Sequence, residues 1–78
     1  MHDVTMPKLS DSMEVGKIIS WLVAEGDRVN VGDVIVEIET DKANVDLEAP
    51  AAGRITEILV PAGSDAKVGT VLATFEEA

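Results

Sequence analysis

Two stretches of the chain alternate apolar and polar positions with a period of two residues. They cover residues 34–39 and 71–76, and their alternating apolar positions are Val34, Val36, Ile38, Val71, Ala73 and Phe75. A period of two is typical of a strand that buries one face. No stretch sustains the three- and four-residue spacing of an amphipathic helix. The pattern therefore predicts an all-β chain of short strands.

An internal repeat relates these two stretches. At a shift of 37 residues, Gly16–Thr40 aligns without gaps on Gly53–Glu77, and nine of the 25 positions are identical. All but one of the identical residues are glycine or apolar, so the two halves are expected to share their turns, their core and one backbone path. Two copies are too few for a solenoid. We therefore expect one compact unit with approximate two-fold symmetry, built from two antiparallel sheets packed face to face or closed into a flattened barrel.

Interruptions of the alternation predict turns and bulges. Four dipeptides are expected to form tight turns between the strands: Gly26-Asp27, Gly32-Asp33, Gly63-Ser64 and Gly69-Thr70. In residues 18–23 and 55–60 an apolar position follows its predecessor by three residues instead of two. This step predicts a bulge or bend in each copy.

The two halves differ just before their first shared glycine. Pro7 lies nine residues before Gly16, whereas Pro50 lies only three residues before Gly53. The first half therefore carries an extra loop, which we assign to Ser10–Glu14. Two interpretations of this loop stay open: a functional insertion, or a neutral surface excursion.

Composition narrows the classes of protein and partner. The 78 residues suffice for a single domain, and they include no cysteine. Fifteen acidic against six basic residues give a formal net charge of −9, which repels phosphate backbones and anionic membrane surfaces. We therefore expect no nucleic-acid partner and no membrane partner. The charge fits either plain solubility or steering toward a basic protein surface.

Residues for conventional catalysis are scarce. The single histidine, His2, is expected at a frayed terminus, so neither a fixed base nor a metal site is predicted. Glu37 and Glu39 alternate along one strand and are interpreted as a solvated face rather than a catalytic pair. We expect that the chain is not an enzyme by itself.

Among the polar residues, Lys42 is the candidate for a functional site. Alternation runs up to Ile38 and resumes at Val45, so the residues between them are expected to form a hairpin turn with Lys42 at or beside its tip. On spacing alone, an ordinary exposed turn lysine is the simpler interpretation.

A resemblance that covers nearly the whole chain changes that interpretation. The chain closely resembles the lipoyl domains of the dihydrolipoyl acyltransferase component of 2-oxo acid dehydrogenase complexes, most of all the pyruvate dehydrogenase type. The matching segments, in order, are Met6-Pro7-Lys8-Leu9-Ser10, Trp21, Glu25-Gly26-Asp27, Gly32-Asp33, Ile38-Glu39-Thr40-Asp41-Lys42-Ala43 and Gly53. The resemblance implies a flattened barrel of two four-stranded antiparallel sheets, with the lysine hairpin at one end and both termini at the other.

The resemblance also implies a carrier function. Lys42 is expected to bear lipoate in amide linkage, with Glu39, Asp41 and Ala43 defining the turn for the modifying enzyme. The loop Ser10, Asp11, Ser12, Met13 and Glu14 is expected to lie beside Lys42 and to contact partners. The implied partners are a lipoate ligase or lipoyl transferase, a thiamine-diphosphate 2-oxo acid decarboxylase, an acyltransferase catalytic core that serves coenzyme A, and dihydrolipoamide dehydrogenase.

Four further classes of protein compete with the lipoyl domain. A biotinyl carrier resembles the same fold, but its pattern has methionines on both sides of the lysine, where this chain has Asp41 and Ala43. The remaining three are the glycine-cleavage hydrogen carrier, an unmodified structural or interaction domain, and an autonomous hydrolase. Acetoin, 2-oxoglutarate and branched-chain complexes stay open beside the pyruvate complex. We expect a single monomeric carrier domain over residues 1–78, part of a larger acyltransferase, in the bacterial cytoplasm or mitochondrial matrix and not secreted.

Overall fold

A computed structural model describes residues 2–77 of the chain, and these residues form eight strands. The strands are β1 (His2–Thr5), β2 (Val15–Trp21), β3 (Arg28–Val29), β4 (Val34–Glu39), β5 (Asn44–Glu48), β6 (Gly53–Ile58), β7 (Asp65–Lys67) and β8 (Val71–Glu77). The all-β prediction is confirmed. Among residues 2–77 there is no helix long and apolar enough to cross a membrane.

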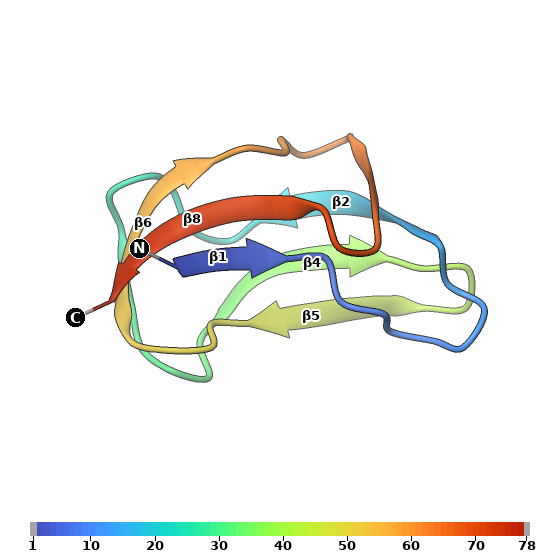
Figure 1. The fold of residues 1–78 in the computed structure, drawn as a ribbon, viewed down its shortest axis with the longest axis horizontal. Coiled ribbons are helices and arrows are strands. Elements are labelled where there is room, and N and C mark those ends of the chain that lie inside the picture. The colour runs from blue at the N-terminus through green and yellow to red at the C-terminus, as the bar shows by residue number, and fades with distance from the viewer. Residues whose placement is uncertain (1, 78) are drawn as a thin grey trace.

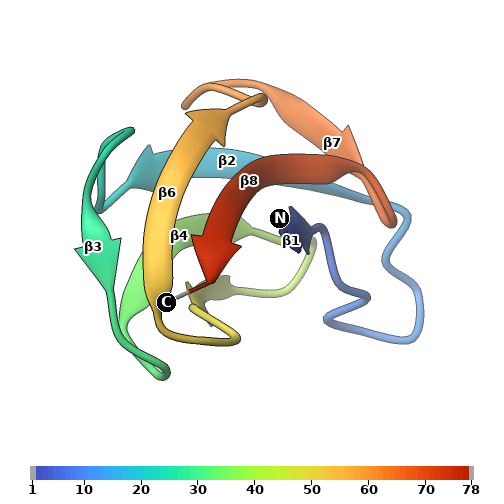
Figure 2. The same cartoon turned by 60° about the vertical axis from the view of Figure 1, so that its left-hand side comes forward.

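The strands form two four-stranded antiparallel sheets with matching topologies. The first sheet has the order β1-β8-β6-β3 and the second has the order β5-β4-β2-β7. In the view of Figure 2, β3, β6 and β8 lie in front of β2 and β4. β8, β6 and β3 in the first order match β4, β2 and β7 in the second, and each matching pair lies at equivalent positions of the two repeat copies. β1 and β5, which precede the copies, take the matching edge positions. The predicted approximate two-fold symmetry is therefore confirmed.

Hydrogen bonds between the halves repeat with the same symmetry. The amide of Gly26 donates to the carbonyl of Ile55, and the amide of Gly63 donates to the carbonyl of Ile18, both at 2.7 Å. Gly26 and Gly63 share a φ of 92°, in the left-handed region that favours glycine. The turn of each half thus binds a strand of the other half, so neither sheet contains only one half of the repeat.

The predicted bulges are present, and a second pair was missed. Between β2 and β4 the register skips Ile19, and between β6 and β8 it skips Thr56, 37 residues further on. The register also skips Ile35 in β4 and Leu72 in β8. The prediction of simple alternation, in which Ile35 and Val36 point to opposite faces of the sheet, was therefore wrong at these bulges. The bulge turns both side chains inward, and both are fully buried.

The core lies between the two sheets and draws on both halves. Its largest fully buried side chains are Phe75, Met6, Ile18, Ile35, Ile38, Ile55, Leu72 and Val36. The Trp21 indole Nε1 donates to the carbonyl of Val60 at 2.8 Å, which ties β2 to the segment after β6.

The expectation of a frayed His2 was wrong. The residue pairs with Phe75 within the first sheet. Its ring stacks on the Phe75 ring, with the ring centroids 5.3 Å apart.

The molecule is elongated, and the β4–β5 hairpin and the chain ends lie at opposite ends of its long axis. It measures 34 × 20 × 18 Å. Figure 1 shows the β4–β5 hairpin and the loop between β1 and β2 at one end, and both ends of the chain at the other. The arrangement implied by the resemblance is therefore present in the structure.

Candidate functional site

Lys42 lies in the link of residues 40–43 that joins β4 to β5, and Asp41 and Lys42 are its two central residues. Glu39 and Asn44 form the last cross-strand pair before the turn. The Thr40 hydroxyl donates to the carbonyl of Ala43 at 2.7 Å and accepts from the amides of Ala43 and Lys42 at 3.1 and 3.3 Å. The Thr40 amide also donates to the carbonyl of Ala43, at 2.9 Å.

Thr40 explains how a hairpin without glycine holds its shape. Two-residue hairpins favour turns in which one or both central residues have positive φ. Among residues 2–77 no residue other than glycine has positive φ, so the Asp41-Lys42 turn is not of that kind. The threonine hydroxyl supplies side-chain hydrogen bonds to the turn backbone in its place. Sequence reasoning missed this role, although a threonine before a turn is its usual signal.

The Lys42 side chain is exposed and free. Within residues 2–77 its ammonium makes no hydrogen bond and no ion pair. The exposed side chains of Glu39 and Asp41 flank it in the sequence. An exposed primary amine on a fixed turn can be acylated without disturbing any packed group, so the residues present fit covalent attachment of a prosthetic group.

The Ser10–Glu14 loop lies against the hairpin. Ser10 Oγ donates to Asp41 Oδ1 at 3.4 Å, and Ser12 Oγ donates to Asp41 Oδ2 at 3.1 Å. Asp11 and Glu14 of the same loop are exposed. The structure therefore brings this loop and the residues around Lys42 together, although they lie about 30 residues apart in the sequence.

Met13 differs from the sequence-based expectation that the whole loop is presented to partners. Only 4% of Met13 is exposed, and it belongs to the hydrophobic core. Its sulfur lies 3.2 Å from the amide of Leu9. Its terminal methyl packs over Gly16, where an added Cβ would lie only 2.8 Å from it. Met13 therefore anchors the loop from beneath and is unavailable to a partner.

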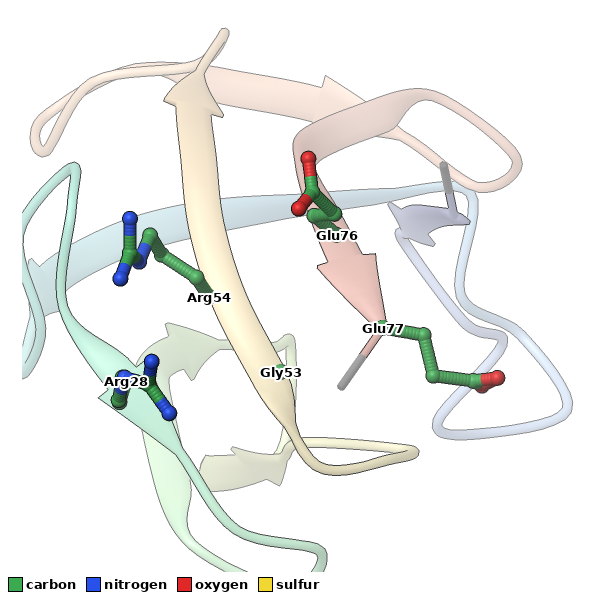
Figure 3. Close-up of a pocket in the computed structure, with 5 residues that line it drawn as sticks. All are labelled: Arg28, Gly53, Arg54, Glu76 and Glu77. Atoms are coloured by element: carbon green, nitrogen blue, oxygen red, sulfur yellow. The ribbon is translucent and has the colours of Figure 1, made fainter.

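A second feature lies away from Lys42, at the end where β8 finishes. Arg28, Gly53, Arg54, Glu76 and Glu77 line a shallow hollow of about 140 Å³. Figure 3 shows the two arginine side chains on one side of it and Glu77 pointing away from them. Glu77 lies 3.3 Å from the His2 imidazole. Sequence reasoning did not predict this hollow.

Known proteins resemble the chain along nearly its whole length. The family described as "Biotin-requiring enzyme" (biotin/lipoyl) matches residues 2–75. Acetyltransferase components of pyruvate dehydrogenase complexes from Rhizobium meliloti and Zymomonas mobilis are each 51% identical to the chain, over 94% and 97% of its length. The chain spans only 17% and 18% of those two proteins.

Two solved structures share the fold. The lipoyl domain of the 2-oxoglutarate dehydrogenase complex from Azotobacter vinelandii superposes with a TM-score of 0.83 at 31% identity, covering 100% of this chain and 99% of that domain. A single-chain, multi-domain long-chain acyl-CoA carboxylase superposes with a TM-score of 0.82 at 23% identity, covering 99% of this chain and 7% of that one. At that identity the second likeness shows the fold alone.

The symmetric two-sheet scaffold and the family match together define the class of protein: the chain belongs to the biotin/lipoyl attachment family. Within that family it is a lipoyl domain of the kind found in acyltransferase components of 2-oxo acid dehydrogenase complexes. Such domains carry lipoate on a lysine.

Proposed function

We propose that Lys42 is the lysine that bears lipoate, and that the chain serves as the swinging-arm carrier of a pyruvate dehydrogenase complex. The observation that carries this proposal is the free, exposed ammonium of Lys42 on a turn fixed by Thr40. Two 51% identical relatives that are acetyltransferase components of that complex support the choice of complex. A succinyltransferase component of a 2-oxoglutarate dehydrogenase complex from Bacillus subtilis is only 38% identical.

The residues of this chain hold and present the arm. Amide formation at Lys42 Nζ removes one positive charge, so the formal net charge changes from −9 to −10. The attached dithiolane supplies the redox and acyl-carrying chemistry. The hairpin keeps the lysine stem at one end of the molecule, and tethering raises the local concentration of the arm at each active site it visits.

The partners follow from this role and form part of the proposal. A lipoate ligase or lipoyl transferase modifies Lys42, and a thiamine-diphosphate decarboxylase provides the acyl group. An acyltransferase core passes that group to coenzyme A, and dihydrolipoamide dehydrogenase restores the disulfide. The chain would act as one domain of a larger acyltransferase in the bacterial cytoplasm or the mitochondrial matrix.

A biotinyl carrier is the second candidate, because its fold is the same. The shared fold does not discriminate between the two groups, as the likeness to the acyl-CoA carboxylase shows. The residues beside the lysine do favour lipoate. Asp41 and Ala43 stand where the biotinyl pattern has methionines, and the 31% identical domain of equal length is a lipoyl domain.

The test is covalent modification of matched variants. The wild-type chain and Lys42→Arg are incubated with lipoate and a lipoate ligase, and in parallel with biotin and a biotin ligase. We expect a lipoyl mass increment on the wild type alone and no biotinylation of either chain. Arginine keeps the charge of an exposed side chain, so Lys42→Arg is expected to fold normally. A lipoyl increment on Lys42→Arg, or efficient biotinylation of the wild type, would refute the proposal.

A further inference from the structure

Asp41 is the one residue of the lysine turn whose side chain reaches the neighbouring loop, within the part of the chain that the structure describes. Its carboxylate accepts from the hydroxyls of Ser10 and Ser12, one on each oxygen, at 3.4 and 3.1 Å. Two such bonds from one loop to one carboxylate restrict both the loop and the turn.

The loop needs this restraint because its own structure is sparse. It lies between β1 and β2 and belongs to no strand, and its backbone bond to another segment is at its last residue, where the Glu14 carbonyl accepts from the amide of Val68 at 3.0 Å. Met13 holds it from beneath through the core, and the Met13 amide donates to the carbonyl of Ser10 at 3.1 Å. Above that anchor, Ser12 and Asp11 are exposed. The hydrogen bonds to Asp41 therefore fix the side of the loop that Met13 does not reach.

The pseudo-symmetry shows that this contact is an addition to the scaffold. The equivalent link in the other half joins β5 to β6 through residues 49–52 and is five residues shorter than the β1–β2 link, residues 6–14. That link lies at the end of the molecule that carries the chain termini (Figure 1). The extra residues are thus placed only at the end that carries Lys42.

We propose that Ser10 and Ser12 are positioning residues that lock the Ser10–Glu14 loop to the Lys42 hairpin, so that the decarboxylase meets one preformed surface. This inference rests on the proposed function and deepens it. A loop that is ordered before docking loses less conformational entropy when the partner binds. The lipoate ligase acts on the lysine of the hairpin, and Thr40 holds that turn independently of the serines. The two serines should therefore affect acyl transfer more than lipoylation.

The experiment compares three lipoylated variants with the lipoylated wild type. Ser10→Ala/Ser12→Ala removes both hydroxyls, whereas Ser10→Thr/Ser12→Thr keeps them. Ser64→Ala is the matched control, because Ser64 precedes β7, at the edge of the second sheet opposite β5. The readouts are amide hydrogen exchange at Leu9 and Met13, the rate of lipoylation by the ligase, and kcat and KM for reductive acetylation by the pyruvate decarboxylase component with pyruvate.

For the double alanine variant we expect faster exchange at Leu9 and Met13 and a KM about three- to tenfold higher, the range for losing one or two net hydrogen bonds. The values of kcat and the lipoylation rate should stay close to those of the wild type, and the threonine and Ser64→Ala variants should behave as the wild type does. Unchanged exchange and KM would overturn the proposal, as would an equal loss of lipoylation. If the wild type itself is not lipoylated at Lys42, the proposed function fails instead.

Discussion

Gly16 and Gly53 open the two halves of the repeat, and both are closed in by neighbours. A Cβ on Gly16 would lie 2.8 Å from Met13 Cε, 2.9 Å from Ile38 Cγ2 and 3.0 Å from Met6 Cε. A Cβ on Gly53 would instead collide with the backbone carbonyl oxygen of Glu76 in the neighbouring strand. The two methionine ends are flexible and can move aside, the β-branched Ile38 methyl can give less, and a paired backbone gives least of all.

This difference predicts unequal costs for the same substitution at equivalent positions. Gly16→Ala should lower the free energy of unfolding by about 1–2 kcal/mol, and Gly53→Ala by about 3 kcal/mol or more. Urea denaturation of both variants, followed by tryptophan fluorescence of Trp21, measures the two changes. Equal costs, or a larger cost at Gly16, would contradict the assigned packing. Gly16→Ala should also disturb the loop near Lys42, because it displaces Met13.

At the scale of the strands, one cross-strand charge pair has opposite character at equivalent positions of the two sheets. Lys17 on β2 lies opposite Asp65 on β7, and at the equivalent place Arg54 on β6 lies opposite Arg28 on β3. Opposite charges at such positions stabilise a sheet and like charges destabilise it. Next to these pairs, Glu39 faces Lys17 and Glu76 faces Arg54 in the same register. The first sheet therefore carries an unfavourable charge pair where the second carries a favourable one.

We predict that Arg28→Glu stabilises the domain by about 0.5 kcal/mol at low ionic strength. The substitution reproduces the charge pattern of the second sheet and keeps a long side-chain stem. It also changes the formal net charge from −9 to −11, but distant charges are screened more strongly than an adjacent pair. Urea midpoints at low and high salt measure the gain, which should shrink as salt rises. A loss of stability at low salt would show that the pair of arginines does not destabilise the first sheet.

The sequence predicts those structural elements that leave a regular spacing of apolar residues, and it does not predict those that leave no such spacing. The bulges at Ile19 and Thr56 follow from the three-residue step between apolar positions. The bulges at Ile35 and Leu72 leave no such step, because each of these residues lies directly between two other apolar residues. Lys42 could be placed because alternation stops and resumes around it. The contacts of Ser10 and Ser12 with Asp41 could not, because exposed polar side chains on distant loops leave no periodic signal.

For the molecule as a whole, the important feature is that the chain ends and the lysine hairpin lie at opposite ends of the flattened barrel. The chain ends lie at one end of a 34 Å axis and the β4–β5 hairpin, which contains Lys42, lies at the other (Figure 1). A domain tethered through either end would therefore present Lys42 away from its tether. The core and the hydrogen bonds between the halves hold the hairpin in place, while the lysine side chain stays free to move.

The most direct test is to locate the acyl group after one round of reductive acetylation. The chain is lipoylated with a ligase, incubated with pyruvate and a pyruvate decarboxylase component, and digested for mass spectrometry. We predict an acetylated, reduced lipoyl group on the peptide that contains Lys42 and on no other peptide. A lipoyl group on Lys8, Lys17 or Lys67, or a Lys42-lipoyl chain that no 2-oxo acid decarboxylase can acylate, would contradict the assignment of Lys42 as the carrier residue.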